Sequence, residues 1–517
     1  MVFRVGFASK VVLLLAVVIF TFIIVVSGGY NVPPTRRMIF SMSRRNRQTA
    51  FAFATATTCT NRVTTSRKMR MTMTMTTTSQ KNFHDATIHT IRIPSDIWRE
   101  AAFQHQERIY QLLQPGFATA ASATTRTGPY DKKKTNTYTS NDDSPTLDPK
   151  HPIYNFLIEY YGLKGMKGPK RLARWSPSPG LVTSLLFNRP HHDGNTVTID
   201  SMEEFQHASY GYAYDKMYHR HHQEQLASEK VSSAPTISNM DVGVVLEGVR
   251  PTEDFEHLLH LRGATILDGK KGDVLYSPSL YFGRNDPSRR DDQIRLVSPF
   301  LWYQSLLKST LQAEPMVYCH GLHEWAMQYQ PDGAPPPPSA KYQAHMPLRV
   351  SQAVINRTVE RRGVHCTHVD ALRFFAPAAA PLSHFGMFEG RQHQMRLEQP
   401  ACVHANMDLL RMALKVRPFC DPILVQRILE LALRARRLDV AASPYDASAY
   451  GIAPIPVETY EGRAHYRLEQ IAIMNQANDI RRDLLALYEL VLSMAFDESL
   501  LEVVPKSTHK KDPAGGS

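Results

Sequence analysis

The strongest constraint on the fold of this chain is the helical period of apolar residues near its C-terminus. Side chains recur at spacings of four and three along the stripe Ile473, Ala477, Ile480, Leu484, Leu487, Val491 and Met494. A second stripe, Leu424, Ile428, Leu431 and Leu438, follows Asp421-Pro422, which is typical of a helix start. Residues three and four apart share a helix face that must be buried against another element. The sequence therefore predicts a mainly α fold, a bundle-like helical domain with few short strands.

Upstream segments carry weaker patterns of the same kind. Ser95 or Asp96 can cap a helix whose apolar residues recur until Pro115. Helices are expected at 94–115, 151–161 and 301–311, a short strand at 241–248, and loops at 186–240 and 264–296. The 186–240 segment is a polar, His-rich insertion that could bind metal weakly, although a solvated loop explains it more simply.

The positive charge of the chain is confined to its N-terminal part. The net charge is +12, yet residues 1–84 hold twelve of the 60 Lys and Arg and none of the 48 Asp and Glu. The remainder is therefore charge-balanced. Proteins that bind the phosphate backbone of DNA normally carry a basic surface. DNA remains a possible partner, but the charge of the body does not favour it.

The N-terminal segment has the composition of a targeting leader. Arg4 and Lys10 precede an apolar run from Val11 to Val26, which suits a signal peptide. An acid-free segment rich in Ser, Thr and Arg follows up to residue 84, as in organelle transit peptides. Together they predict import into a plastid, with no stable membrane span after the leader is removed. Entry into the secretory pathway and a signal anchor are the alternatives.

These patterns divide the chain into five parts. The expected parts are a signal-like segment (1–28), a transit-like segment (29–84), a short helix plus linker (85–148), a catalytic helical domain (149–505) and a disordered tail (506–517). Five cysteines without a CxxC pair do not form a disulfide scaffold, so a reducing compartment is expected.

Titratable residues crowd into two apolar segments, 365–375 and 399–408. His365 and His368 are three residues apart, and His404 and Asp408 are four apart, so each pair can share a helix face. Imidazole and carboxylate ligands suit a divalent ion such as Fe, Mn or Zn. The expected metal ligands are His365, His368, His404 and Asp408. The alternative is that these histidines are hydrogen-bonded core residues.

The same residues could act without a metal. A carboxylate can activate water and a histidine can protonate a leaving group. The candidate catalytic residues are Asp370, Asp408, His404, His368, Glu324 and His323. The candidate substrate-binding residues are Arg373, Trp325, Phe374, Asn406, Tyr160 and Tyr445. An ion pair with Asp370 is the alternative for Arg373, and core packing is the alternative for the aromatic residues.

Several motifs resemble one family. They are His151-Pro152 through Tyr160-Tyr161, Gly321-Leu322-His323-Glu324-Trp325-Ala326-Met327, Cys366-Thr367-His368 through Phe374-Phe375, Gln399-Pro400 through Asp408-Leu409, and Ser443-Pro444-Tyr445-Asp446. They are similar to segments of a family from actinobacteria, cyanobacteria and plants that is commonly labelled "3-methyladenine DNA glycosylase". Asn155 stands where that family usually has Asp.

The resemblance implies an all-α hydrolase that cleaves N-glycosidic bonds. Its substrate would be a modified base or a smaller nucleoside-like molecule. In that case Trp325 and Phe374 would hold the base, and Asp370 or Asp408 would activate water. Two further functions stay open: a plastid His/carboxylate metalloenzyme, for example with non-haem iron, that acts on a small molecule, and a protein whose histidines ligate a pigment or cofactor.

Overall fold

The computed structural model describes residues 88–118, 145–165, 167–178, 196–209, 241–250, 253–254, 257–258, 264–268, 272–283, 290–337, 345–386 and 392–495. The expected leader and tail, and most of the expected linker and of the His-rich insertion, lie outside these residues. The described elements all belong to one unit, which spans Gln80–Ser517.

The predicted mainly helical fold is confirmed. The α-helices are α2 (Ser95–Leu113), α4 (Asn155–Glu159), α5 (Lys167–Ala173), α7 (Met202–Ser209), α9 (Pro278–Phe282), α10 (Arg290–Gln312), α11 (Leu322–Met327), α12 (Gln352–Arg362), α13 (Val369–Leu372), α14 (Gln392–Leu397), α15 (Val403–Val416), α16 (Pro422–Ala442) and α17 (Tyr460–Ala495). Short 3-10 helices lie at Gln114–Gly116, Pro377–Leu382 and Ser448–Tyr450.

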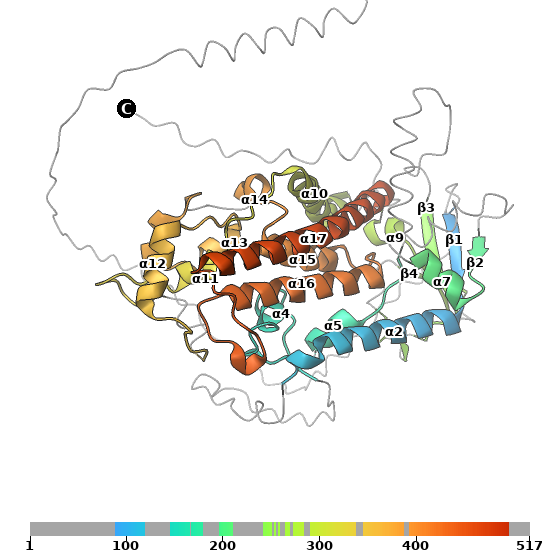
Figure 1. Ribbon diagram of the computed structural model, residues 1–517. Coiled ribbons are helices and arrows are strands. Elements are labelled where there is room, and N and C mark those ends of the chain that lie inside the picture. Colours follow the sequence, from blue (N-terminus) through green and yellow to red (C-terminus); the bar gives the residue numbers. More distant parts are fainter. Residues whose placement is uncertain are drawn as a thin grey trace, which may run out of the picture. The chain divides into compact units, whose positions relative to one another are not determined.

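Helices α15, α16 and α17 pack on one another and form the centre of the body, with α10 against α17 (Figure 1). The predicted stripe of α17, from Ile473 to Met494, is at most 1% exposed at every position. Full burial of one such side chain contributes about 1.5–3 kcal/mol to stability. The apolar period read from the sequence therefore identifies the main packing surface.

Helix α16 begins where the sequence places its start. The carboxylate of Asp421 accepts hydrogen bonds from the backbone N–H groups of Ile423 and Leu424, at 2.8 and 3.4 Å. Pro422 occupies the first turn, where its missing N–H leaves no bond unmade. The N-cap of α16 is thus confirmed.

A small mixed sheet lies beside the helices. Its strands are β1 (Ile88–Ile93), β2 (Thr196–Thr198), β3 (Asp241–Leu246), β4 (Ala264–Asp268) and β5 (Asp273–Tyr276), in the order β2-β1-β3-β5-β4. Strands β2, β1 and β3 are parallel, whereas β5 is antiparallel to both β3 and β4. Trp98 of α2 and Trp175 pack into the core of this sheet, so the 95–113 helix joins the sheet to α5 and α16.

Three local expectations were wrong. The 264–296 segment was expected to be a loop, but it contains β4, β5, α9 and the first turns of α10. The 186–240 segment includes β2 and α7. Neither Ser95 nor Asp96 caps α2 with its side chain, because Pro94 occupies the N-cap position. Pairing between distant strands, as in β3 with β5, stabilises segments whose own sequence looks irregular.

The helix expected at 151–161 is shorter than the pattern suggests. Only α4, Asn155–Glu159, is α-helical, and His151 to Tyr154 form a turn before it. This arrangement brings Tyr160 and Tyr161 out of the helix at its end. Within the described residues, no helix combines the length and apolar character needed to cross a membrane.

Candidate functional site

A cavity of about 330 Å³ lies between the α4 segment and helices α11, α13, α15 and α16. Its lining combines titratable and aromatic side chains. The lining residues are Asn155, Phe156, Glu159, Tyr160, Tyr161, Glu324, Met327, His368, Asp370, Ala371, Arg373, Phe374, His404, Met407, Asp408, Arg411, Arg436 and Tyr445.

Most side chains singled out in the sequence meet at this cavity. They are Asp370, Asp408, His404, His368 and Glu324 among the candidate catalytic residues, and Arg373, Phe374, Tyr160 and Tyr445 among the candidate substrate-binding residues. Helix α15 supplies two of them, because His404 and Asp408 are one turn apart. His368 lies in extended backbone just before α13, which carries Asp370.

Asp408 is surrounded by three groups that favour its charged form. His368 Nε2 is hydrogen-bonded to Asp408 Oδ2 at 3.3 Å, and the Tyr161 hydroxyl donates to Asp408 Oδ1 at 3.3 Å. The guanidinium of Arg411 lies 3.5 Å from Oδ1. Burial alone would raise the pKa of Asp408, but the hydrogen bond and charge of His368, together with Arg411, lower it. Asp408 is therefore an ionised carboxylate inside the cavity.

Asp370 forms an ion pair with Arg373, which was the alternative to a substrate-binding role for Arg373. Arg373 lies 3.3 Å from Asp370 Oδ1, and its side chain is 60% exposed. Arg411 approaches the other oxygen of Asp370 at 3.7 Å. Arg411 thus lies between Asp408 and Asp370 and connects the two carboxylates of the cavity wall.

Behind the cavity lies a buried group that could hold a metal ion. Its members are His323 on α11, His404 on α15 and Asp439 on α16, whose ligand atoms all lie within 4.8 Å of one another. His323 Nε2 is 2.8 Å from Asp439 Oδ1, and His404 Nε2 is 3.8 Å from Asp439 Oδ2. His404 also lines the cavity, so it joins the buried group to open space.

The donor atoms of this group suit a cation. His323 Nε2 and Asp439 Oδ1 are both buried and lie 2.8 Å apart, and within the described residues neither has a hydrogen-bond partner besides the other. Buried polar atoms seldom have so few partners, and a cation held by the imidazoles and the carboxylate would supply another. Burial lowers the pKa of His404 well below its usual value, and the neighbouring His323 lowers it further. His404 is therefore neutral, the form that ligates a metal.

One fixed cation already lies beside Asp439. The guanidinium Nη1 of Arg436 is 2.7 Å from Asp439 Oδ2 and 3.1 Å from Glu324 Oε1, and Nε donates to the carbonyl of Pro152 at 3.0 Å. Burial raises the pKa of Asp439, but the contact with His323 and the charge of Arg436 outweigh it and hold that pKa well below its usual range. Asp439 therefore stays ionised.

Glu324 behaves in the opposite way to Asp408. Burial raises the pKa of Glu324, and the negative charge of Asp439 adds to this, while Arg436 acts against both. The second oxygen, Oε2, is buried and has no hydrogen-bond partner within the described residues. Glu324 is thus the cavity carboxyl group that retains a proton more readily.

Four residues named from the sequence lie elsewhere. His365 stacks on His384, with ring centroids 4.9 Å apart, and lines a different cavity, so the structure separates it from His368, His404 and Asp408. Asn406 is 0% exposed and accepts a hydrogen bond from Arg481. His323 lies in the buried group, out of the cavity lining.

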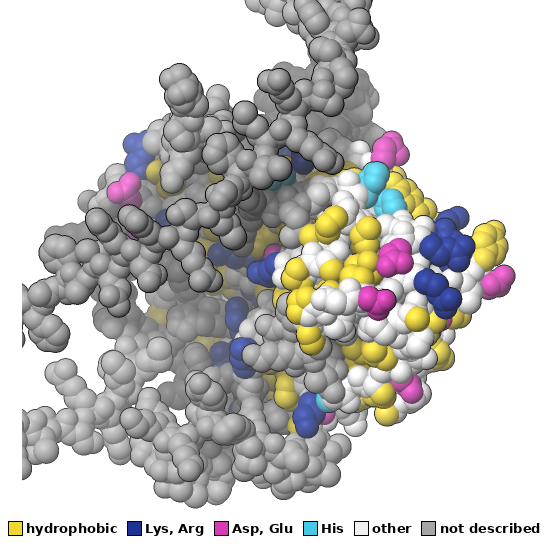
Figure 2. Space-filling model, turned by 90° about the vertical axis from the view of Figure 1, so that its left-hand side faces the viewer, with side chains coloured by type: hydrophobic (Ala, Val, Ile, Leu, Met, Phe, Trp, Pro, Cys, Tyr) yellow, Lys and Arg dark blue, Asp and Glu magenta, His cyan; other side chains and the backbone are white. Residues whose placement is uncertain are grey.

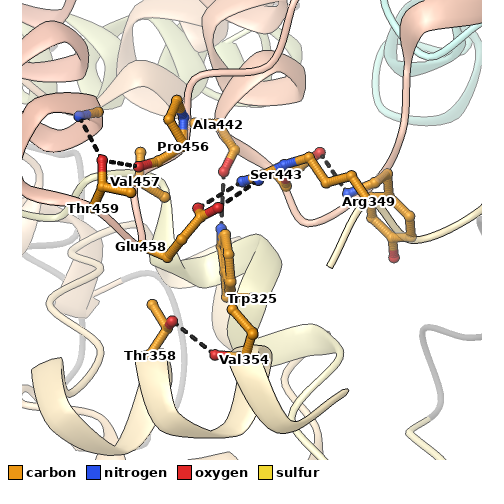
Figure 3. Close-up of polar contacts among 12 residues, drawn as sticks. Trp325, Arg349, Val354, Thr358, Ala442, Ser443, Pro456, Val457, Glu458 and Thr459 are labelled. Atoms are coloured by element: carbon orange, nitrogen blue, oxygen red, sulfur yellow. Dashed lines mark hydrogen bonds and ion pairs between the residues drawn. The ribbon is translucent and has the colours of Figure 1, made fainter. Parts of the chain in front are cut away.

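Trp325 is the fourth residue. It is 0% exposed, and its indole N–H donates to the carbonyl of Ala442 at 2.8 Å (Figure 3). The guanidinium of Arg349 lies over its ring and forms an ion pair with Glu458 at 2.7 Å. The structure therefore places Trp325 in the core, where it ties α11 to the end of α16, and gives it no surface on the cavity.

The sequence reasoning missed Asp439, Arg436 and Arg411. A signal for Asp439 does exist, because it continues the buried series Ile428, Ala432 and Ala435 of α16 at spacings of four and three. A charged residue on an apolar helix face is seldom fully buried without a partner. Such a position marks a buried polar network even when its partners are distant in the sequence.

Comparison with protein-family models, with curated proteins and with solved structures finds no match to this chain.

Proposed function

We propose that the cavity is the active site of a hydrolase that cleaves the N-glycosidic bond of a modified purine nucleoside or base. The observation that supports this most is the pair of buried carboxyl groups, Asp408 and Glu324, in one cavity lining with pKa values displaced in opposite directions. Two carboxyl groups held in different protonation states are the usual machinery of glycosidic hydrolysis.

The proposed reaction needs one base and one acid. Asp408, ionised and held by His368 and Arg411, accepts a proton from water while the water oxygen bonds to the anomeric carbon. The C–N bond breaks, and its electron pair goes to the departing nitrogen of the base. Glu324 gives its proton to that nitrogen. The products are a free base and a sugar with a new hydroxyl group.

Aromatic side chains in the lining suit a flat substrate. Tyr160 and Phe374 meet edge to face at 6.1 Å between centroids, and Arg373 lies over the Phe374 ring at 5.3 Å. Aromatic faces and guanidinium planes stack on nucleobases. A volume of about 330 Å³ is at the small end of ligand pockets, so one nucleoside or one extruded base is the expected size.

The test is release of free base from methylated purine nucleosides and, in parallel, from alkylated DNA, measured by liquid chromatography. Wild-type protein should release base, and Asp408→Asn should reduce the rate by about 10²–10⁴-fold. Asp479→Asn is the matched control, because Asp479 is an exposed carboxylate paired with Arg482 on α17. No release from either substrate at stoichiometric protein would exclude the proposal.

A metal-assisted reaction is the second candidate, and the buried group of His323, His404 and Asp439 favours it. Two imidazoles and one carboxylate form the ligand set of catalytic zinc sites and also suit iron or manganese. These three residues would hold the ion, which when bound would activate water at the back of the cavity. Arg436, 2.7 Å from Asp439, would compete with it.

Elemental analysis of protein purified without chelator separates the two candidates. The metal candidate predicts one zinc, iron or manganese ion per chain and a loss of that ion in His323→Ala. His105→Ala is the control. His105 is also a buried histidine, but it does not belong to this group and is hydrogen-bonded to the Leu172 carbonyl. A metal-free protein whose activity persists in EDTA would remove this candidate.

We also infer from the leader composition that residues 1–84 direct import into a plastid. A fluorescent protein fused behind these residues should accumulate in plastids. Accumulation in the secretory pathway would contradict this localisation.

A further inference from the structure

A second cavity of about 350 Å³ lies where α11, α12 and the start of α17 come together (Figure 1). It is lined by Tyr318, His320, Leu322, Arg362, His365, Tyr460, Arg463, Ala464 and Arg467. Three arginines and two histidines line it, and no carboxylate does. It shares no lining residue with the first cavity.

The charges of these arginines are not neutralised by ion pairs. Among the described residues, Arg362 and Arg467 form no ion pair, and Arg463 donates to the carbonyls of Val457 and Glu458 at 3.0 and 3.1 Å. The carboxylate whose charge raises the pKa of Arg463 is that of Glu461, which is exposed to solvent. Figure 2 views the molecule from the end that carries α12 and shows several Lys and Arg side chains on that surface, with Asp and Glu side chains among them. Like charges held together repel unless an anion joins them.

His320 gives this cavity a buried, unpaired polar atom. The residue is 7% exposed, and its Nε2 has no hydrogen-bond partner within the described residues. Burial lowers its pKa to about 4, and the charges of Arg467, Arg463 and Arg362 contribute. The ring is therefore neutral at neutral pH and can donate one hydrogen bond without adding charge.

The backbone holds His320 in an unusual conformation. Its φ is 48°, the one positive value among the described residues other than glycine, and Gly321 follows with a φ of 67°. Non-glycine residues in this region are strained and persist where the surroundings fix them. This double left-handed turn places His320 at the second cavity and His323 in the buried group.

The start of α17 adds a further positive contribution. Tyr460, Arg463, Ala464 and Arg467 lie on its first turns, and the helix continues to Ala495. The N-terminus of a long helix carries partial positive charge, and in α17 the Gly462 N–H is already bonded to Thr459 Oγ1 at 3.0 Å. Helix end, arginines and His320 thus all favour an anion at one place.

We propose that this cavity binds a small molecule that carries a phosphate monoester, with the phosphate held by Arg362, Arg463, Arg467 and His320. Guanidinium groups match the oxygens of a phosphate dianion with paired hydrogen bonds. The volume exceeds what the phosphate group alone needs and lies within the range of ligand pockets. Tyr318 and Tyr460 line the rest of the cavity and would contact the organic part.

Isothermal titration calorimetry of the full-length chain, in phosphate-free buffer, tests this site with glycerol phosphate and inorganic phosphate as probes. Saturable binding of one molecule per chain is expected. Arg467→Gln and Arg362→Gln should each weaken it at least tenfold. Arg482→Gln is the matched control, because it removes the same charge from an exposed position on α17 and should bind as wild type does.

Three outcomes would overturn the proposal. They are the absence of saturable binding, an equal loss in Arg482→Gln, and tighter binding of a single-stranded oligonucleotide that depends on the same arginines. Both test residues are exposed, and thermal unfolding should confirm that each variant folds. The result is independent of the hydrolase proposal, since base release depends on the other cavity.

Discussion

His368 and His404 stack on each other, with ring centroids 4.9 Å apart and ring planes inclined by 25°. One ring is bonded to Asp408 in the cavity, and the other lies against Asp439 in the buried group. The stack is thus the point where the proposed acid–base pair and the candidate metal ligands meet. A substitution on one side of this stack should therefore also affect the residues on the other side.

The pH dependence of base release should follow the two cavity carboxyl groups. Asp408 has a lowered pKa and stays ionised at any pH above its usual 3.8, whereas Glu324 must keep a proton that it loses as pH rises through its raised pKa. The rate should therefore fall on the alkaline side. Glu324→Gln should lower the rate by about 10²–10⁴-fold and remove that alkaline limb. An unchanged limb in the variant would assign the acid to another group.

The His368–Asp408 pair should stabilise the fold within a defined pH range. Burial lowers the pKa of His368, but the hydrogen bond and charge of Asp408 outweigh it, so the pKa is raised above 6.5. That stabilisation is complete below 6.5 and is lost as pH rises through the folded value. The Asp408 part is present above 3.8 and is lost as pH falls through its lowered folded value.

The measurement is the free energy of urea unfolding of wild type and His368→Gln between pH 4 and 9. Their difference should be largest near pH 4–6.5 and should shrink above that range. The difference between wild type and His105→Gln should instead grow as pH rises toward 6.5. Burial lowers the pKa of His105 to about 3, so below 6.5 the unfolded chain binds a proton that the folded protein does not. A pH-independent difference for His368→Gln would show that the pair is not charged.

Asp439→Asn should destabilise the protein strongly. Asp439 is fully buried, and its loss leaves the buried guanidinium of Arg436 with Glu324 alone as a carboxylate partner within the described residues. Removing one partner of a buried ion pair costs about 3–5 kcal/mol. Urea unfolding would measure this, with Glu458→Gln as the control that breaks the half-buried pair with Arg349. A loss for Asp439→Asn no greater than that of the control would contradict a central role for Asp439.

Asn406→Ala should affect stability and leave substrate affinity unchanged. Asn406 was expected to bind substrate, yet its side-chain oxygen accepts a hydrogen bond from the buried Arg481. Losing a hydrogen bond to a charged group costs about 1.5–3 kcal/mol. Unfolding free energies and the KM for the nucleoside substrate separate the two roles. Asn475→Ala, at an exposed position of α17, should change neither. A raised KM at full stability would restore the substrate-binding role.

The sequence by itself determined the helical body and most of the titratable residues that line the site. The apolar period of α16 and α17, and the start of α16 at Asp421, depend on local geometry, which a sequence shows directly. The concentration of His368, His404 and Asp408 also marked the cavity wall, because titratable residues in apolar segments are costly unless they are paired.

Only the tertiary structure decided which residues act together. Spacing along the chain placed His365 beside His368 on one helix face, but the backbone between them is not helical, and the two residues line different cavities. Asp439 and Arg436 lie at the site because helices distant in sequence pack against one another. The same packing buries Trp325 and Asn406 in the core. A site is set by distances across packed elements, and a helical period fixes only which face of each element turns inward.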